Sequence, residues 1–212
     1  DTSNPFKTSF DAAFKTAWAG FRHCGEFTLS QGEKFSPMSH LTQGCVAFLP
    51  SFEFPSHVRI DLPTSKTDPF CKGVSILLAK APSLTCPVTA LHNLFLVDQK
   101  PHDAPLFTNL DGSPLSHNMF ISLLKQHLLH CNIDPMHFSG HSFCWGVATA
   151  AAAVGYTEHK IQLLGRWRSD AYKVYIDVLQ ECMLSLSSRL HLATSHAHNF
   201  APLSLLFAPP MA

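Results

Sequence analysis

The sequence predicts a mostly α-helical domain with one small antiparallel β-sheet, an α+β fold. Apolar residues recur at helical spacing over most of the chain, and three short apolar runs lie near its N-terminal third. A hydrophobic content of 46% with only 14% charged residues is typical of a globular protein. A length of 212 residues suits one domain with a tail, and we place the domain at 1–180 and the tail at 181–212.

The first expected element is a helix over 8–24, because its apolar residues recur every three or four positions. Thr8 or Ser9 would cap this helix, and Gly25 would end it. The polar stretch 31–44, which contains Gly and Pro, indicates a loop.

Three strands are expected next, at Val46–Leu49, Val58–Leu62 and Val74–Ala79. The last two flank the segment Pro63–Pro69, whose breaker residues predict a hairpin turn. Strands joined by a hairpin pair in antiparallel fashion, so the sheet should be antiparallel.

Helices should resume after the sheet. The first spans 87–99, where Pro87 suits the opening turn. The second spans 116–131, and Ser116 would cap its N-terminus.

Three more helices are expected in the C-terminal part of the domain. The Ala-rich stretch 142–154 favours helix and has Gly155 as its C-cap. A short helix begins at Thr157 and ends at Gly165. The last covers 169–179 and starts at the cap Ser169.

The charge balance is neutral, with 15 Lys and Arg against 15 Asp and Glu. A nucleic-acid-binding domain usually has a basic excess, so composition by itself argues mildly against DNA. The 14 histidines qualify this argument, because their protonation would add positive charge below about pH 6.5.

The seven cysteines are scattered, without a Cys-x-x-Cys pair. This usage is typical of reduced intracellular thiols and disfavours a disulfide framework or a zinc site. The chain opens without a charged and apolar leader and has no apolar run of about 18 residues. We therefore expect an intracellular protein without a membrane span.

Four segments contain residues suited to phosphate chemistry. Phosphoryl transfer needs a nucleophile in line with the leaving oxygen, positive groups beside the nonbridging oxygens, and an acid for the leaving oxygen. The segments are Gly20-Phe21-Arg22-His23-Cys24-Gly25-Glu26, Leu62-Pro63-Thr64-Ser65-Lys66-Thr67-Asp68-Pro69-Phe70, His141-Ser142-Phe143-Cys144, and Gly165-Arg166-Trp167 followed by Tyr175.

In order and spacing, these segments resemble the catalytic domain of the tyrosine recombinases, over roughly residues 8–180. The run from Ser65 to Phe70 is most similar to recombinases of eukaryotic mobile elements, the Crypton and DIRS-like types. The resemblance implies the recombinase catalytic-domain fold and an activity in DNA integration and recombination, including transposition.

The resemblance also implies a role for each segment. Arg22 would bind the phosphate through its planar fork, and Glu26 would orient the site. His141 would contact the scissile phosphate. Lys66, at the tip of the hairpin, would protonate the leaving oxygen.

The nucleophile implied by the resemblance is Tyr175, which follows Trp167 by eight residues, and Tyr172 is its rival. Trp167 would pack against the phosphate and donate its indole N–H. We expect Arg22, Lys66, His141, Trp167 and Tyr175 to converge on one cleft.

Cys144 stands where the family has a second arginine. A thiol is a weak donor and cannot give the charged, bidentate contact of a guanidinium. We therefore expect impaired catalysis. The alternative is a non-catalytic DNA-binding or protein-interaction module that retains the recombinase fold.

Two further interpretations use nearby residues. Arg166 or Arg168 could swing in to replace the missing arginine. Cys144 and His141 could instead form the nucleophile and base of a cysteine hydrolase. No acid or oxyanion loop accompanies that pair in the sequence.

The expected partner is DNA, on which several protomers would assemble, in the nucleus if the host is eukaryotic. No metal, nucleotide or other small-molecule cofactor is expected, because a phosphotyrosine conserves the energy of the broken bond. The segment 181–212 would be a C-terminal helix and tail for exchange between protomers. A local basic patch would add DNA affinity, from Arg59, Lys66, Lys72, Arg166, Arg168 and Lys173.

Overall fold

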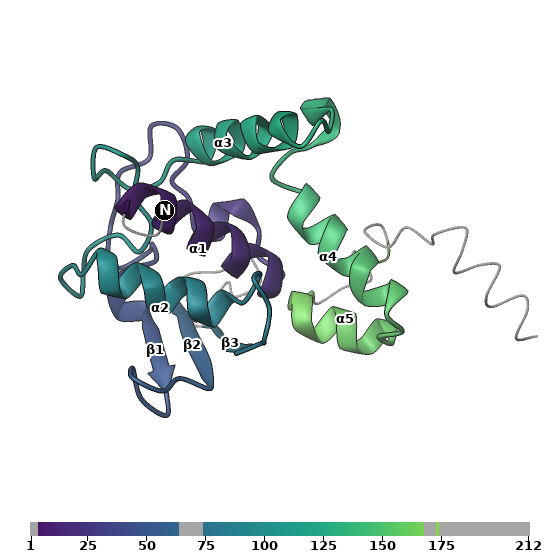
Figure 1. The fold of residues 1–212 in the computed structure, drawn as a ribbon, viewed down its shortest axis with the longest axis horizontal. Coiled ribbons are helices and arrows are strands. Elements are labelled where there is room, and N and C mark those ends of the chain that lie inside the picture. The colour runs from purple at the N-terminus through teal and green to yellow at the C-terminus, as the bar shows by residue number, and fades with distance from the viewer. Residues whose placement is uncertain (1–3, 64–73, 168–172, 174–212) are drawn as a thin grey trace, which may run out of the picture. The chain divides into compact units, whose positions relative to one another are not determined.

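A computed structural model describes residues 4–63, 74–167 and 173 of the chain. The described residues all belong to one compact unit, which ends at Ile176. Five α-helices and a three-stranded antiparallel sheet make up the described part, in agreement with the α+β prediction (Figure 1). The expected helix over 169–179 and the tail lie outside the described residues.

Helix α1 spans Pro5–Ala19, so the expected bounds of 8–24 were wrong at both ends. The side chain of Asn4 caps it by accepting hydrogen bonds from the N–H groups of Phe6 and Lys7, at 3.0 and 3.2 Å. The predicted caps Thr8 and Ser9 are instead buried inside the helix.

The end of α1 was mispredicted because Phe21 continues the apolar spacing but leaves the helical conformation. Gly20 is the C-cap, and Phe21 adopts a left-handed φ of 51°. The Arg22 N–H then bonds to the Ala17 oxygen at 2.9 Å. A short 3₁₀-helix, η1, follows at Cys24–Glu26.

The sheet consists of β1 (Val46–Leu49), β2 (His57–Leu62) and β3 (Val74–Ala79), in the order β1-β2-β3. Both pairings are antiparallel, with Val46 opposite Ile60 and His57 opposite Ala79. The strand predictions are confirmed to within one residue. A further 3₁₀-helix, η2 (Gln43–Cys45), leads into β1.

Four α-helices follow the sheet in the described part of the chain. Helix α2 spans Pro87–Val97 and α3 spans His117–His130, and the Ser116 hydroxyl caps α3 by accepting the Met119 N–H at 3.2 Å. A 3₁₀-helix, η3 (Pro135–His137), leads to α4 at Ser142–Ala153. Helix α5 covers Glu158–Gly165. These bounds confirm the sequence prediction to within two residues.

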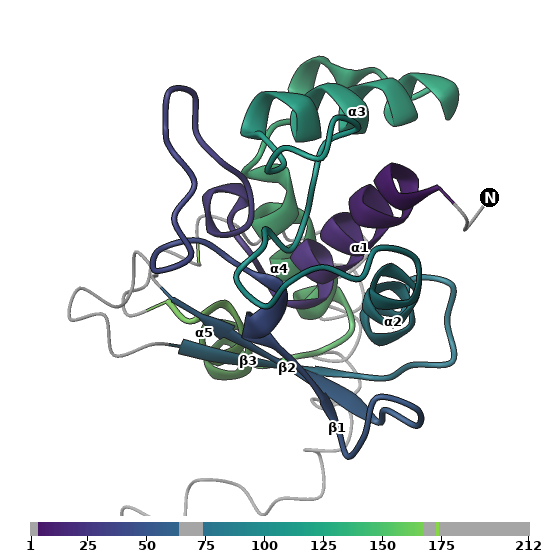
Figure 2. The same ribbon diagram turned by 90° about the vertical axis from the view of Figure 1, so that its left-hand side faces the viewer.

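Two hydrophobic clusters lie on either side of the segment that follows α1. In the larger cluster, α1 and α2 pack together above the sheet (Figure 2), and Phe120 of α3 is fully buried. The smaller cluster joins Phe21 to α4 and α5 through Val147, Ala148 and Ile161. Because both clusters hold the segment after α1, the position of Arg22–Glu26 is fixed by the fold. No helix in the described part of the chain has the length and apolar character to cross a bilayer.

Candidate functional site

The Arg22 side chain is fully buried immediately after α1. Its Nη2 donates to the main-chain oxygen of Glu26 at 2.6 Å, and its guanidinium lies over the Phe27 ring, 5.3 Å from the centroid. Burial, opposed by the Glu26 carboxylate and assisted by Arg166, lowers the pKa of Arg22 to about 10. The group is still charged at neutral pH, yet none of the described residues forms a hydrogen bond with its Nε or Nη1 atom.

A second arginine shares the same carboxylate. Arg166 donates from Nη2 to Glu26 Oε2 at 3.0 Å and from Nη1 to the Gly20 oxygen at 2.8 Å. Glu26 Oε2 is also 3.9 Å from Arg22 Nε. Two guanidiniums therefore share one carboxylate in a nearly buried environment, which ties the segment after α1 to the residue after α5.

Cys144 is fully buried in α4 and faces the same segment. Its thiol lies 3.6 Å from the Arg22 main-chain oxygen and 3.2 Å from His23 Nδ1. Burial raises the pKa of this thiol to about 12, Glu26 adds to the rise, and Arg166 opposes it. At neutral pH the group is a neutral thiol, and the imidazole beside it belongs to His23, in contrast to the pairing with His141 considered from sequence.

His23, His117 and His141 line a cavity of about 400 Å³, which we call the histidine cavity. They come from three separate parts of the fold: the segment after α1, the first residue of α3 and the N-cap of α4. Asn118 and Ser139 supply further polar groups to its wall. Within the described residues, no three His, Cys, Asp or Glu side chains are placed to hold a metal ion.

Because Gly140 has no side chain, His117 and Cys24 can pack against it in the wall of the histidine cavity. A Cβ at this position would lie 3.1 Å from Cε1 of His117 and 3.2 Å from Sγ of Cys24. The Cys24 thiol also donates a hydrogen bond to the main-chain oxygen of Gly140, at 3.5 Å. Burial and, to a smaller extent, the neighbouring Cys144 raise the pKa of Cys24 to about 12, against the effect of Arg22.

A second cavity, of about 360 Å³, adjoins the first through His23 and Gly25. Its wall is mainly apolar and includes Phe35, Phe107 and Leu115. His23 thus lines both cavities, whereas Arg22 lines neither of them.

Trp167 lies where the chain leaves α5. Its ring meets Phe21 edge-on, with centroids 6.2 Å apart, and covers Gly165 so closely that any side chain there would collide with it. Trp167 and Arg166 therefore join the segment that carries Arg22 and Glu26.

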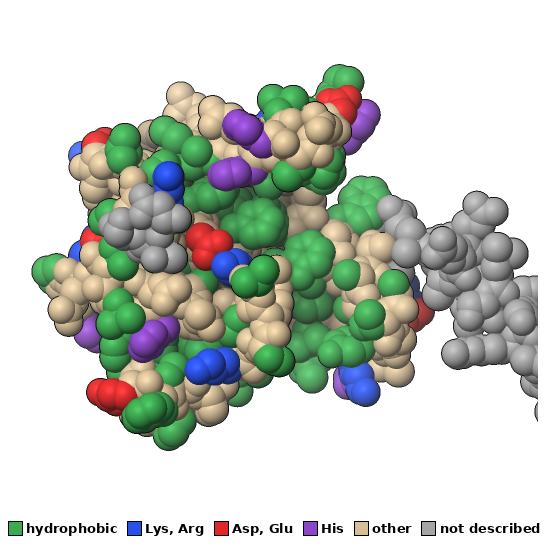
Figure 3. Space-filling view, in the orientation of Figure 1, with side chains coloured by type: hydrophobic (Ala, Val, Ile, Leu, Met, Phe, Trp, Pro, Cys, Tyr) green, Lys and Arg blue, Asp and Glu red, His purple; other side chains and the backbone are tan. Residues whose placement is uncertain are grey.

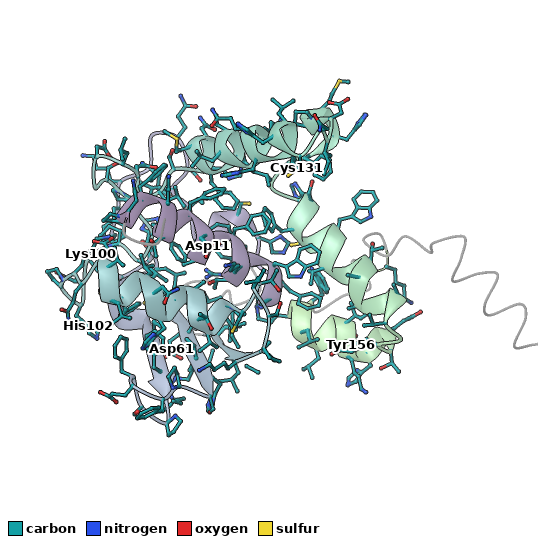
Figure 4. All side chains as sticks on the ribbon, in the orientation of Figure 1. Asp11, Asp61, Lys100, His102, Cys131 and Tyr156 are labelled. Carbon is teal, nitrogen blue, oxygen red and sulfur yellow. The ribbon has the colours of Figure 1, made fainter. Side chains whose placement is uncertain are left out.

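Three of the predicted catalytic segments meet in this way, but the remaining predicted residues are elsewhere or not described. Lys66, Lys72, Arg168, Tyr172 and Tyr175 lie outside the described residues. Of the three tyrosines, only Tyr156 is described, half exposed at the turn after α4 (Figure 4).

Each described member of the predicted basic patch has an acidic partner. Arg59 is exposed on β2 and pairs with Asp61 at 3.1 Å. Lys173 lies 3.9 Å from Glu158, and Arg166 is nearly buried. On the face drawn in Figure 3, Lys and Arg side chains are scattered among acidic and apolar ones. The DNA interface remains a prediction.

His23 and His117 were missed as site residues. A signal for His23 was present, because it follows Arg22 directly at the end of a helix. Consecutive side chains in such a turn point in different directions. Here His23 lines the cavity, whereas Arg22 is buried in the fold. His117 carried no comparable signal, since its approach to His141 depends on how α3 and α4 pack.

No protein-family model matches this sequence, and a comparison with curated proteins gives no significant match.

Proposed function

We propose that this domain binds DNA phosphates and cleaves and rejoins DNA strands in the manner of the tyrosine recombinases, at a strongly reduced rate. The observation that supports the proposal is the contact between three motif-bearing segments far apart in sequence. Glu26 pairs with Arg166, Phe21 meets Trp167, and the thiol of Cys144 reaches the main chain of Arg22.

The proposed reaction is a phosphoryl transfer. The phenol of Tyr175 gives its proton to His141 as its oxygen attacks the scissile phosphorus, and the bond to the 5′ oxygen breaks. Lys66 gives that oxygen a proton, so the products are a 3′-phosphotyrosine and a free 5′ hydroxyl. The same steps in reverse, on a partner strand, rejoin the DNA without a nucleotide cofactor.

Cys144 explains the expected low rate. A positive donor beside the nonbridging oxygens stabilises the charge that builds in the transition state. A neutral thiol supplies no such charge, and loss of one donor typically costs about 10² to 10³ in rate. Arg22 does not compensate, because its side chain is fully buried.

The second candidate function is a non-catalytic module that binds DNA or protein with the same fold. Cys144 and Arg22 favour this candidate, because the Cys144 thiol is neutral and the Arg22 guanidinium is fully buried. A domain that no longer cleaves could still bind the phosphate backbone, with an affinity that falls as salt rises.

A suicide DNA substrate separates the two candidates, because cleavage on it traps the covalent adduct. We expect a weak adduct with the full chain, a stronger one with Cys144→Arg, and none with Tyr175→Phe. Mass spectrometry should place the phosphate on Tyr175. Tyr172→Phe is the matched control and should keep the adduct.

The outcome that overturns strand cleavage is the lack of adduct from a folded Cys144→Arg protein that still binds the substrate. That result would support the non-catalytic module. An adduct that survives Tyr175→Phe and is lost in Tyr172→Phe would instead move the nucleophile to Tyr172.

A further inference from the structure

The histidine cavity has the chemistry of an anion site whose charge depends on protons. Three histidines line it, together with Asn118 and Ser139. No Asp, Glu, Lys or Arg is among the described residues of its wall. Imidazole is the side chain that ordinarily changes charge between pH 5 and 8, so protonation would turn a neutral wall into a cationic one.

Two helices begin at this cavity. His117 is the first residue of the 14-residue α3, and His141 is the N-cap of the 12-residue α4. The N-terminal end of a helix carries a partial positive charge and favours an anion nearby. The two helix ends add to the charge of the imidazoles, which remain the main feature of the site.

The other titratable groups around the cavity do not neutralise the positive charge of protonated imidazoles. Burial keeps the thiols of Cys24 and Cys144 neutral up to high pH, since it raises both pKa values to about 12. The Glu26 carboxylate is held by Arg166 and Arg22.

One more acid lies near the segment that supplies Ser30 to the cavity wall. Glu33 accepts the Ser30 N–H at 3.0 Å and pairs with His40 at 3.0 Å. The Ser30 hydrogen bond, followed by that of His40, lowers the pKa of Glu33, so this carboxylate keeps a constant charge above acidic pH.

We propose that the histidine cavity is a proton-gated site for a phosphate group, in which His23 and His117 join His141 to supply the positive charge that Cys144 does not. The inference deepens the proposed function, because it makes DNA the expected source of the phosphate. Binding should be stronger in acidic than in alkaline solution, because an imidazole carries a positive charge only when it is protonated.

Sulfate is a suitable probe, because its own charge stays constant between pH 5 and 9. Binding to the full chain would be followed at pH 5.8 and 8.0 by calorimetry and by the ring ¹⁵N signals of the histidines. We expect about tenfold or greater weakening at pH 8.0, and a similar loss at pH 5.8 in His23→Gln and in His117→Gln, since each removes a charged hydrogen-bond donor.

His159→Gln is the matched control, because His159 is an exposed histidine of α5 outside the cavity wall. It should bind sulfate like the unmodified chain. His141→Gln changes an exposed side chain, so it keeps the test decisive if a variant at His23 or His117 fails to fold. Equal binding at the two pH values, or full binding by the folded cavity variants, would overturn the proposal.

Inorganic phosphate and a short DNA duplex distinguish the sources of the group. Both should displace sulfate at pH 5.8 if DNA presents the phosphate. Displacement by inorganic phosphate alone would overturn DNA as the source. Sulfate binding at pH 5.8 by a folded Cys144→Arg chain that binds the suicide substrate but forms no covalent adduct would sustain the proton-gated site and refute strand cleavage.

Discussion

The thiol sulfur of Cys144 lies 3.2 Å from Nδ1 of His23, although 121 positions separate the two residues in the chain. Arg22, one position before His23, is turned into the interior, where its guanidinium is fully enclosed. In the segment after α1, His23 therefore lines the cavities, whereas the guanidinium of Arg22 pairs with Glu26 inside the fold. This arrangement shifts the expected phosphate contact from Arg22 towards His23.

Glu26→Gln should strongly destabilise the fold. The carboxylate is the shared partner of Arg166 and Arg22, and its loss leaves two nearly buried guanidiniums without a compensating charge. Removal of one partner from a buried ion pair typically costs about 3–5 kcal/mol. Urea denaturation should show a lower midpoint.

The control for Glu26→Gln is Asp61→Asn. The Asp61 carboxylate pairs with Arg59 on the surface, where each side chain is 47% exposed. Exposed pairs contribute about 1 kcal/mol at most, so this variant should unfold near the unmodified midpoint. Similar losses in the two variants would contradict a buried, shared carboxylate.

The strands were predictable because local chemistry determines them. Val46–Leu49 and Val74–Ala79 are short apolar runs bounded by breaker residues, and the structure gives them the same bounds. The start of α1 was harder, because its first turns bury Thr8 and Ser9, two polar residues that the apolar pattern does not include. The end of α1 could not be predicted from the sequence, because Phe21 continues the helical spacing of apolar residues although its backbone is left-handed.

The site was predictable only as a set of segments. Motif spacing identified the segments of Arg22, Cys144 and Trp167, and packing brings them together. The sequence could not show that Cys144 meets His23, since that contact depends on how α4 packs on the segment after α1. The exclusion of Arg22 from the cavities has the same origin, because burial is a property of the tertiary fold.

The aromatic cluster around Phe120 should be the main hydrophobic support of α3. Phe120 is fully buried, with its ring centroid 5.0 Å from that of Phe27 and 5.5 Å from that of Phe143. Phe120→Ala should lower the free energy of unfolding by about 3–5 kcal/mol. Phe54→Ala removes a phenylalanine that is 83% exposed, and it should change stability by less than about 0.5 kcal/mol.

Stability should fall in alkaline solution because of two buried thiols. Cys24 and Cys144 have pKa values raised from 9.0 to about 12 in the folded chain. Above pH 9 the unfolded chain loses these protons while the folded chain keeps them, so stability declines as pH rises from 9 towards 12. Each thiol contributes at most about 1.4 kcal/mol per pH unit.

Urea midpoints measured between pH 8.5 and 10.5 test this decline. The double variant Cys24→Ala, Cys144→Ala should show a shallower slope than the unmodified chain, whatever its absolute stability. Cys131→Ala is the matched control, since it removes an exposed thiol at the end of α3, and it should keep the original slope. An unchanged slope in the double variant would rule out buried neutral thiols at the site.

Gly140→Ala should disturb both the fold and the histidine cavity. The added Cβ would lie 3.1 Å from Cε1 of His117 and 3.2 Å from Sγ of Cys24, so at least one of these side chains must move. Overpacking of this kind costs about 1–3 kcal/mol. A displaced His117 ring should also weaken sulfate binding at pH 5.8.

Gly25→Ala is the appropriate control, because Gly25 lines the same cavity but a Cβ there would meet nothing within 4 Å. This variant should keep the unfolding midpoint and the sulfate affinity of the unmodified chain. The comparison separates a general effect of an added methyl group from a specific effect on His117. If the ring ¹⁵N signals show that His117 has moved in Gly140→Ala and sulfate still binds as well as in Gly25→Ala, the imidazole of His117 does not contact the anion, and its place in the site would have to be abandoned.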